Sequence, residues 1–109
     1  DGIFALDVAR ETGGGIDAVS EQEITDGIAL LAETTGIFTE TAGGVTTAVL
    51  KRLAERGEIG RDERVVVYIT GDGLKTLDAV AERVEPIVIN PTVSDFEAAV
   101  HGRGAPLPA

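Results

Sequence analysis

The chain has 109 residues, a length that suits one small domain or a part of a larger one. Its formal net charge of −10, from 19 acidic and 9 basic residues, argues against nucleic acid as a partner, because phosphate backbones attract basic surfaces. Cysteine is absent and histidine occurs once, which excludes disulfides, thiolate nucleophiles, zinc–thiolate sites and histidine-rich metal sites.

The start of the chain and its apolar runs bear on the cellular location of the protein. The sequence begins with Asp1 rather than Met, and we expect it to be cut from a longer protein. No apolar run is long enough to cross a bilayer, and no charged-then-apolar signal segment opens the chain. We therefore predict a cytoplasmic protein with no membrane partner.

The first third of the chain is predicted to hold two helices. Apolar spacing predicts a helix over residues 1–12, which three glycines at 13–15 end, and residues 16–19 are predicted to form a short edge strand. A second helix begins at Ser20, because Glu23 completes a Ser-x-x-Glu capping box. Its acidic residues are interpreted as a solvated face, opposite an apolar stripe of Ile24, Ile28 and Leu31.

Gly36 is predicted to end the second helix, and a third helix follows over residues 45–56. The small residues Ala42, Gly43 and Gly44 stand at its first turn, where glycine is a poor helix former. Two readings are open at this point. The bare helix N-terminus could bind an anion, or the small residues could let the helix pack tightly on a sheet.

Residues 65–69 are a continuous β-branched and aromatic run without polar alternation, typical of a strand buried on both faces of a parallel sheet. The run ends in Thr70-Gly71-Asp72-Gly73, where two glycines allow a tight turn and a close approach of backbone to a ligand. Ligands of open α/β sheets lie outside the carboxyl ends of the strands, so Thr70 is a candidate ligand-binding hydroxyl. The alternative is an ordinary strand-to-helix turn.

The last third is predicted to alternate short elements. A helix capped by Thr76 is broken at Pro86, a short buried strand spans 87–89, and a last helix starts with a capping box at Ser94. Residues 102–109 contain two prolines and two glycines and are predicted to be a loose tail.

Two of these motifs carry a resemblance to a known family. Glu40-Thr41-Ala42-Gly43-Gly44 opens a helix, and Thr70-Gly71-Asp72-Gly73-Leu74-Lys75 closes a strand. Together they resemble the C-terminal part of threonine synthase, a fold-type-II pyridoxal-phosphate enzyme. Residues 36–40 and 5–10 also look like that family, and the resemblance covers about residues 1–90 and weakens beyond Asn90.

The resemblance implies an α/β fold. We expect the C-terminal part of a three-layer αβα domain of the tryptophan-synthase-β type, with a mostly parallel sheet. Residues 1–90 would be the C-terminal portion of the catalytic domain that binds pyridoxal 5'-phosphate. Residues 91–109 would form a C-terminal helix and the loose tail.

The resemblance also implies a reaction and a set of cofactor contacts. Threonine synthase converts O-phosphohomoserine and water to threonine and phosphate, with pyridoxal phosphate as the electron sink. The hydroxyl of Thr70 would contact the pyridine nitrogen, and the turn at Gly71 and Gly73 would let backbone lie beside the ring. Further residues expected to line the cofactor cavity are Glu40, Ala42 and Gly43.

The chain departs from the family pattern in two respects that bear on activity. The family's Schiff-base lysine lies in a Ser-Phe-Lys-type segment near the start of the full enzyme, and neither Lys51 nor Lys75 has that context. The glycine-rich loop that holds the cofactor phosphate is also absent. We therefore expect no catalytic residue here, and no activity without the missing N-terminal part.

Several alternatives remain open from the sequence. The chain could be a free-standing small α/β domain with a binding or structural role and no chemistry. It could also be part of a related fold-type-II dehydratase, although the Gly-Leu-Lys ending of the second motif argues against this. A homodimer is compatible with the resemblance.

Overall fold

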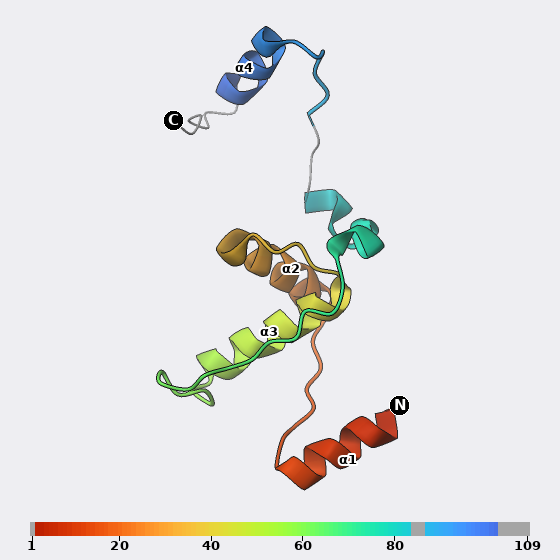
Figure 1. The fold of residues 1–109 in the computed structure, drawn as a ribbon, viewed down its shortest axis with the longest axis vertical. Coiled ribbons are helices and arrows are strands. Elements are labelled where there is room, and N and C mark those ends of the chain that lie inside the picture. Colours follow the sequence, from red (N-terminus) through yellow and green to blue (C-terminus); the bar gives the residue numbers. More distant parts are fainter. Residues whose placement is uncertain (1, 84–86, 103–109) are drawn as a thin grey trace.

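The computed structural model describes residues 2–83 and 87–102. Two helices cross at the centre of the molecule, and two further helices lie at opposite ends of its 60 Å long axis (Figure 1). In chain order the elements are α1 (Gly2–Thr12), α2 (Glu21–Thr35), α3 (Thr41–Glu55), the 3₁₀ helix η1 (Gly73–Arg83) and α4 (Val93–Gly102). None of the helices in these two ranges is long and apolar enough to span a membrane.

The packed centre is the crossing of α2 with α3, which η1 also contacts. Ile28 of α2 is 2% exposed and Ala48 of α3 is 9% exposed. The backbones of α2 and α3 approach each other closely at Gly27 and Gly44. A β-carbon on either glycine would meet main-chain atoms of the other helix. The glycines are therefore required by the helix crossing, in spite of their poor helix propensity.

The ends of α2 follow the local signals in the sequence. Ser20 is its N-cap, its Oγ accepts a hydrogen bond from the Glu23 N–H, and the Glu23 carboxylate accepts the Ser20 N–H at 2.8 Å. Gly36 ends the helix in the left-handed conformation at φ 75°. The predicted capping box and glycine stop are both confirmed, because each depends only on residues that are near in sequence.

The predicted parallel sheet is not confirmed by the part of the chain that the structure describes. These residues form no strand, and their only β-pairing is an isolated antiparallel bridge between Thr39 and Asp72. Residues 16–19, 65–69 and 87–89, which we predicted as strands, are without regular structure. The expected three-layer αβα arrangement is accordingly absent from the described residues, which are largely helical.

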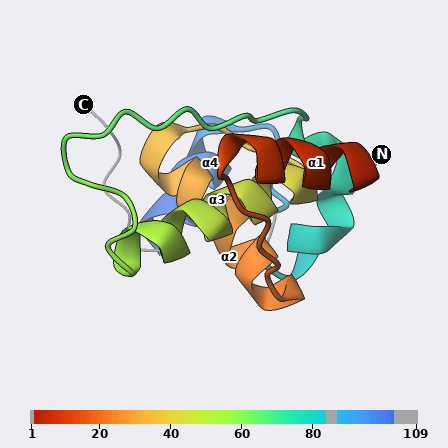
Figure 2. The ribbon, with the colours of Figure 1, turned by 90° about the horizontal axis from the view of Figure 1, so that it is seen from below.

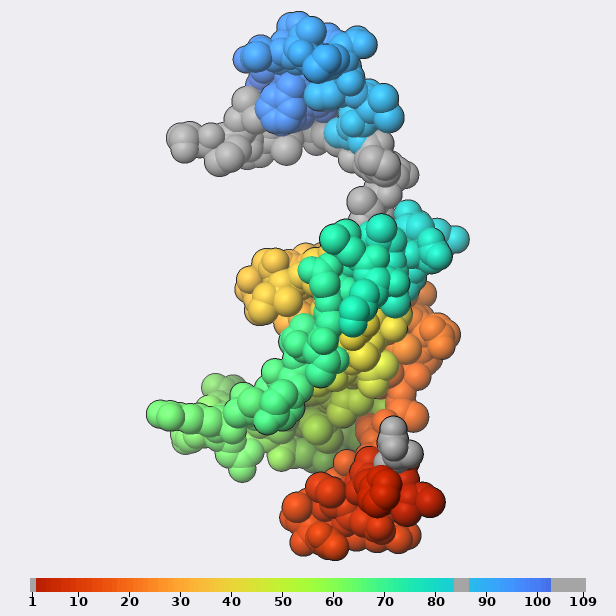
Figure 3. Space-filling model, turned by 45° about the vertical axis from the view of Figure 1, so that its right-hand side comes forward, coloured from red at the N-terminus to blue at the C-terminus, as the bar shows by residue number. Residues whose placement is uncertain are grey.

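The apolar run that was predicted as the central strand has no neighbouring strand to pair with. The segment 64–70 runs along one side of α3 without a neighbouring strand, as Figures 1 and 2 agree. It covers part of that helix in the space-filling view (Figure 3). Its side chains Val66 and Tyr68 are 78% and 77% exposed. A strand needs partners for its N–H and C=O groups, and an apolar pattern signals burial without supplying the partner strands.

The last two predicted helix starts have different outcomes. Thr76 lies at a kink, with φ −134° and ψ 45°, between the two helical stretches that make up η1, so a helical stretch does begin after it; its Oγ1 accepts the Thr41 N–H at 3.2 Å. The last helix begins at Val93, and Thr92 Oγ1 accepts the Asp95 N–H at 3.2 Å where a box of Ser94 and Glu97 was predicted. The predicted break at Pro86 and most of the predicted tail, residues 103–109, lie outside the described residues.

Candidate functional site

The two motifs that carry the family resemblance meet in space. The Glu40 N–H donates to the Gly71 carbonyl at 3.1 Å, and the Gly73 N–H donates to the Phe38 carbonyl at 3.2 Å. These two bonds flank the bridge between Thr39 and Asp72. The chain just before α3 is thus joined to the turn between the extended segment and η1.

Thr39 is the buried centre of this junction. It is fully buried, and its Oγ1 donates to the Gly71 carbonyl at 3.1 Å. A β-carbon on Gly43 would overlap the Thr39 side chain. Gly43 therefore makes room for Thr39, and Thr39 in turn fixes the carbonyl of Gly71.

Glu40 is the N-cap residue of α3, but its side chain makes no capping hydrogen bond. The carboxylate instead lies against Gly71, where a β-carbon on that glycine would overlap it. It forms an ion pair with Lys75, with 3.4 Å between Oε2 and Nζ. The Glu40 side chain is 17% exposed and the Lys75 side chain 61% exposed. The acid is thus mostly buried and its cationic partner faces solvent.

The first turn of α3 has little donor capacity left for an anion. The Glu40 N–H is bonded to Gly71, and the Thr41 N–H donates to Thr76 Oγ1 at 3.2 Å. A β-carbon on Gly44 would lie 2.6 Å from the Ile24 carbonyl oxygen. Of the two readings of the small residues, the structure favours tight packing, although against α2 and not against a sheet.

The structure brings together some of the residues predicted to contact the cofactor and leaves others at the surface. Glu40, Gly71 and Gly43 belong to the junction just described. Gly73 is buried, and Phe38 fills the space beside it where a β-carbon would be. Thr70 and Ala42 are exposed, so both are open to a bound molecule. Their contact with a cofactor stays a prediction.

Sequence reasoning missed three residues of the junction: Phe38, Thr39 and Lys75 as the partner of Glu40. Each acts across more than 30 positions of sequence, for which a single sequence offers little signal. A partial signal exists near Thr39, because a glycine inside a helix, such as Gly43, can mark the close approach of another group. We had interpreted Lys75 only as the end of the turn motif.

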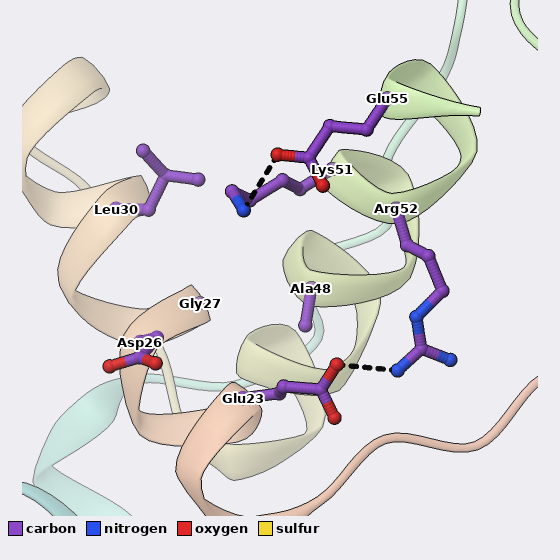
Figure 4. Close-up of a pocket in the computed structure, with 8 residues that line it drawn as sticks. All are labelled: Glu23, Asp26, Gly27, Leu30, Ala48, Lys51, Arg52 and Glu55. Atoms are coloured by element: carbon purple, nitrogen blue, oxygen red, sulfur yellow. Dashed lines mark hydrogen bonds and ion pairs between the residues drawn. The ribbon is translucent and has the colours of Figure 1, made fainter. Parts of the chain in front are cut away.

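A second group of charged side chains lines a groove between α2 and α3 (Figure 4). Arg52 bonds the Glu23 carboxylate at 2.5 Å and the Asp17 carboxylate at 3.0 Å, while Lys51 pairs with Glu55 at 2.8 Å. Hydrogen bonds from the Ser20 backbone, from Arg52 and from the Ser20 hydroxyl lower the pKa of Glu23 to about 2. Asp26, which also lines the groove, pairs with Arg83 of η1. These acids pair with bases, which indicates a structural network.

No group of three residues able to hold a metal ion occurs among the described residues.

Comparison with known proteins assigns the class. Residues 1–71 match the family model described as "Pyridoxal-phosphate dependent enzyme". The chain belongs to this family. Its members depend on pyridoxal phosphate, which agrees with the cofactor that the two motifs predicted.

Within the family, the chain is similar to threonine synthases. It is 46% identical to the threonine synthase of Methanocaldococcus jannaschii over 86 residues, which are 78% of this chain and 21% of that protein. It is 36% identical to the threonine synthase of Methanosarcina acetivorans over 100 residues, 91% of this chain and 25% of that protein. A cysteate synthase of Methanoregula boonei is 36% identical over 98 residues, 88% of this chain and 22% of that protein. The chain thus spans a quarter or less of these curated relatives.

The residues present fit part of a pyridoxal-phosphate site. Thr70 is exposed and its hydroxyl is a donor that suits a neutral pyridine nitrogen. The turn that follows it is held by hydrogen bonds at Gly71 and Gly73. The faces of Gly71 and Gly73, however, are occupied by the Glu40 and Phe38 side chains. These glycines allow the turn to pack against the chain before α3, and the neighbouring Thr70 is exposed.

Proposed function

We propose that this chain is the C-terminal part of a threonine synthase, which converts O-phosphohomoserine and water to threonine and phosphate. The observation that carries the proposal is the junction of the two motifs, which joins Glu40 to the turn that follows Thr70 by a hydrogen bond and an ion pair. The similarity to threonine synthases of two archaea supports the same reaction.

The chain's own residues would form one wall of the site. Thr70 would donate its hydroxyl proton in a hydrogen bond to the cofactor's pyridine nitrogen, and Ala42 would line the cavity. Glu40, Gly71, Gly43 and Gly73 would hold the wall in shape. Bound pyridoxal phosphate would supply the electron sink for the reaction.

The lysine that attaches the cofactor and the loop that binds its phosphate would come from the N-terminal part of the whole protein. Lys51 pairs with Glu55 beside the groove between α2 and α3, and Lys75 pairs with Glu40. A nucleophilic lysine needs a desolvated setting, and both of these side chains are more than half exposed. We therefore propose that the present chain is inactive alone. The enzyme would work in the cytoplasm, and a homodimer is compatible with this arrangement.

The proposal is tested on the full-length protein that contains this chain. Purified with pyridoxal phosphate, it is expected to show the visible absorbance of the bound cofactor and to release threonine and phosphate in equal amounts from O-phosphohomoserine. A protein that binds the cofactor but yields no threonine would contradict the assignment.

A second candidate function rests on the similarity to the cysteate synthase. The cysteate synthase and the threonine synthase of Methanosarcina acetivorans are equally identical to this chain, at 36%, and match similar shares of it, 88% and 91%. Product analysis separates the two candidates, because threonine and cysteate differ in charge and mass. Cysteate without threonine, formed by the full-length protein when it is supplied with a cell extract, would favour the second candidate.

A further inference from the structure

The Glu40 carboxylate is an unusual group for the inside of the junction. Its side chain is 17% exposed and it lies against Gly71, the residue that follows the predicted cofactor contact Thr70. A mostly buried charge is costly unless it has a partner. Its ion-pair partner is the Lys75 ammonium at 3.4 Å, which belongs to the same motif as Gly71.

We propose that Lys75 is a positioning residue for the cofactor wall. Its ammonium holds the Glu40 carboxylate against Gly71, and the carboxylate in turn holds the turn that presents Thr70. This inference rests on the proposed function, since it gives Lys75 a role in the same site. Lys75 itself contacts neither cofactor nor substrate in this account.

Geometry supports an action through Glu40. The carboxylate fills the space that the missing side chain of Gly71 leaves, and the backbone of the same residue bonds the Gly71 carbonyl. Glu40 therefore touches the turn twice, through its side chain and through its N–H. Without Lys75 the carboxylate would lose its compensating charge, and it would move toward water and leave Gly71 without its packing partner.

The exposure of Lys75 separates this role from a structural one. An ion pair whose cation is 61% exposed adds little to global stability, because solvent screens it. The loss of Lys75 should therefore leave the melting temperature nearly unchanged and yet loosen the turn. The loss of a merely structural residue would lower the melting temperature and loosen the turn together.

The test uses four variants of the full-length protein: Lys75→Met, Lys75→Arg, Glu40→Gln and the double variant of Lys75→Met with Glu40→Gln. Amide hydrogen exchange across residues 70–73 is measured on the cofactor-free protein, and cofactor affinity is measured by visible absorbance. Lys51→Met is the matched control, because Lys51 also pairs with an exposed glutamate, at 2.8 Å, but in the groove between α2 and α3, away from the junction.

Lys75→Met is expected to speed exchange across residues 70–73 and to weaken cofactor binding, each by about 3- to 10-fold, as for coupled side chains in contact. Lys75→Arg should keep both the exchange rate and the cofactor affinity close to those of the wild type, since it keeps the charge. In the Glu40→Gln background the same Lys75→Met change should add less than about twofold, because the residue through which it acts has lost its charge. The Lys51→Met control should alter neither readout.

Each contrary result has a distinct meaning. An equal loss from Lys75→Met in both backgrounds would show that Lys75 acts directly and would overturn the inference. Unchanged exchange across residues 70–73 in the cofactor-free protein would overturn it as well. A wild-type protein that binds no pyridoxal phosphate would instead refute the proposed function, and the exchange measurements would still decide whether Lys75 holds Glu40.

Discussion

A methyl group added at Gly44 is the sharpest test of how α2 and α3 are packed. The β-carbon of Gly44→Ala would lie 2.6 Å from the Ile24 carbonyl oxygen and 2.8 Å from Cγ1 of Ile28. Ordinary van der Waals contact begins at 3.4 Å, so the two helices would have to separate by about 0.8 Å. The carbonyl belongs to the backbone of α2 and cannot rotate away, and the Ile28 side chain is 2% exposed.

The expected cost follows from two opposing effects. Overpacking of a well-filled contact costs about 1–3 kcal/mol, and the rigid obstacle places this case in the upper part of that range. Replacing glycine by alanine inside a helix returns about 1 kcal/mol through helix propensity. The net loss should be about 1–2 kcal/mol, which raises the population of locally open forms about 5- to 30-fold.

Amide hydrogen exchange of the full-length protein measures this opening directly in α2 and α3. Gly2→Ala serves as the control, because a β-carbon on Gly2, also in a helix, meets nothing within 4 Å. Exchange in α2 and α3 should be faster in Gly44→Ala and unchanged in the control. Equal or slower exchange in Gly44→Ala would refute the reasoning, since it would mean that helix propensity outweighs the close backbone contact.

Three further predictions concern acid stability, the cofactor and the isolated chain. The pKa of Glu23 is lowered to about 2 from 4.5, so the stability it contributes is complete above pH 4.5 and is lost as the pH falls toward about 2. Glu23→Gln should remove that part of the acid unfolding profile, and an unaltered profile would exclude the capping box as its source. Thr70→Asp in the full-length protein should keep the fold but shift the cofactor's absorbance, because a carboxylate favours protonation of the pyridine nitrogen. An unchanged spectrum would show that Thr70 does not face the ring. The isolated chain, mixed with pyridoxal phosphate and reduced with borohydride, should carry no covalent cofactor by mass spectrometry. A specific adduct on Lys51 or Lys75, with threonine formed from O-phosphohomoserine, would contradict this.

The helices could be predicted from the sequence because their determinants are local. The Ser20–Glu23 capping box and the left-handed Gly36 involve residues within a few positions of the helix ends, and both are found. Gly57 likewise adopts a positive φ, of 71°, just beyond residue 56, at which the third helix was predicted to end. Such signals do not depend on what surrounds the helix.

The sheet and the details of the site could not be predicted with the same success, since both depend on distant partners. The run 65–69 has a strand's composition, but a strand exists only when a neighbour accepts its hydrogen bonds. The contacts of Glu40 with Gly71 and Lys75 cross more than 30 residues. The motifs indicated that the two segments matter, but not that one holds the other.

The junction shows how the candidate site can keep its shape although the segment that leads to it is unpaired. Val66 and Tyr68 are largely exposed, so residues 64–70 gain little support from packing of their own. The turn that follows is nevertheless fixed from the opposite side, by Thr39 and by the backbone of Glu40, both at the start of α3. The start of α3 is rigid because Gly43 accommodates Thr39 and Gly44 locks the helix onto α2. We therefore expect the helix pair to influence the position of Thr70, and substitutions at the α2–α3 crossing to reach the proposed cofactor wall through this chain of contacts.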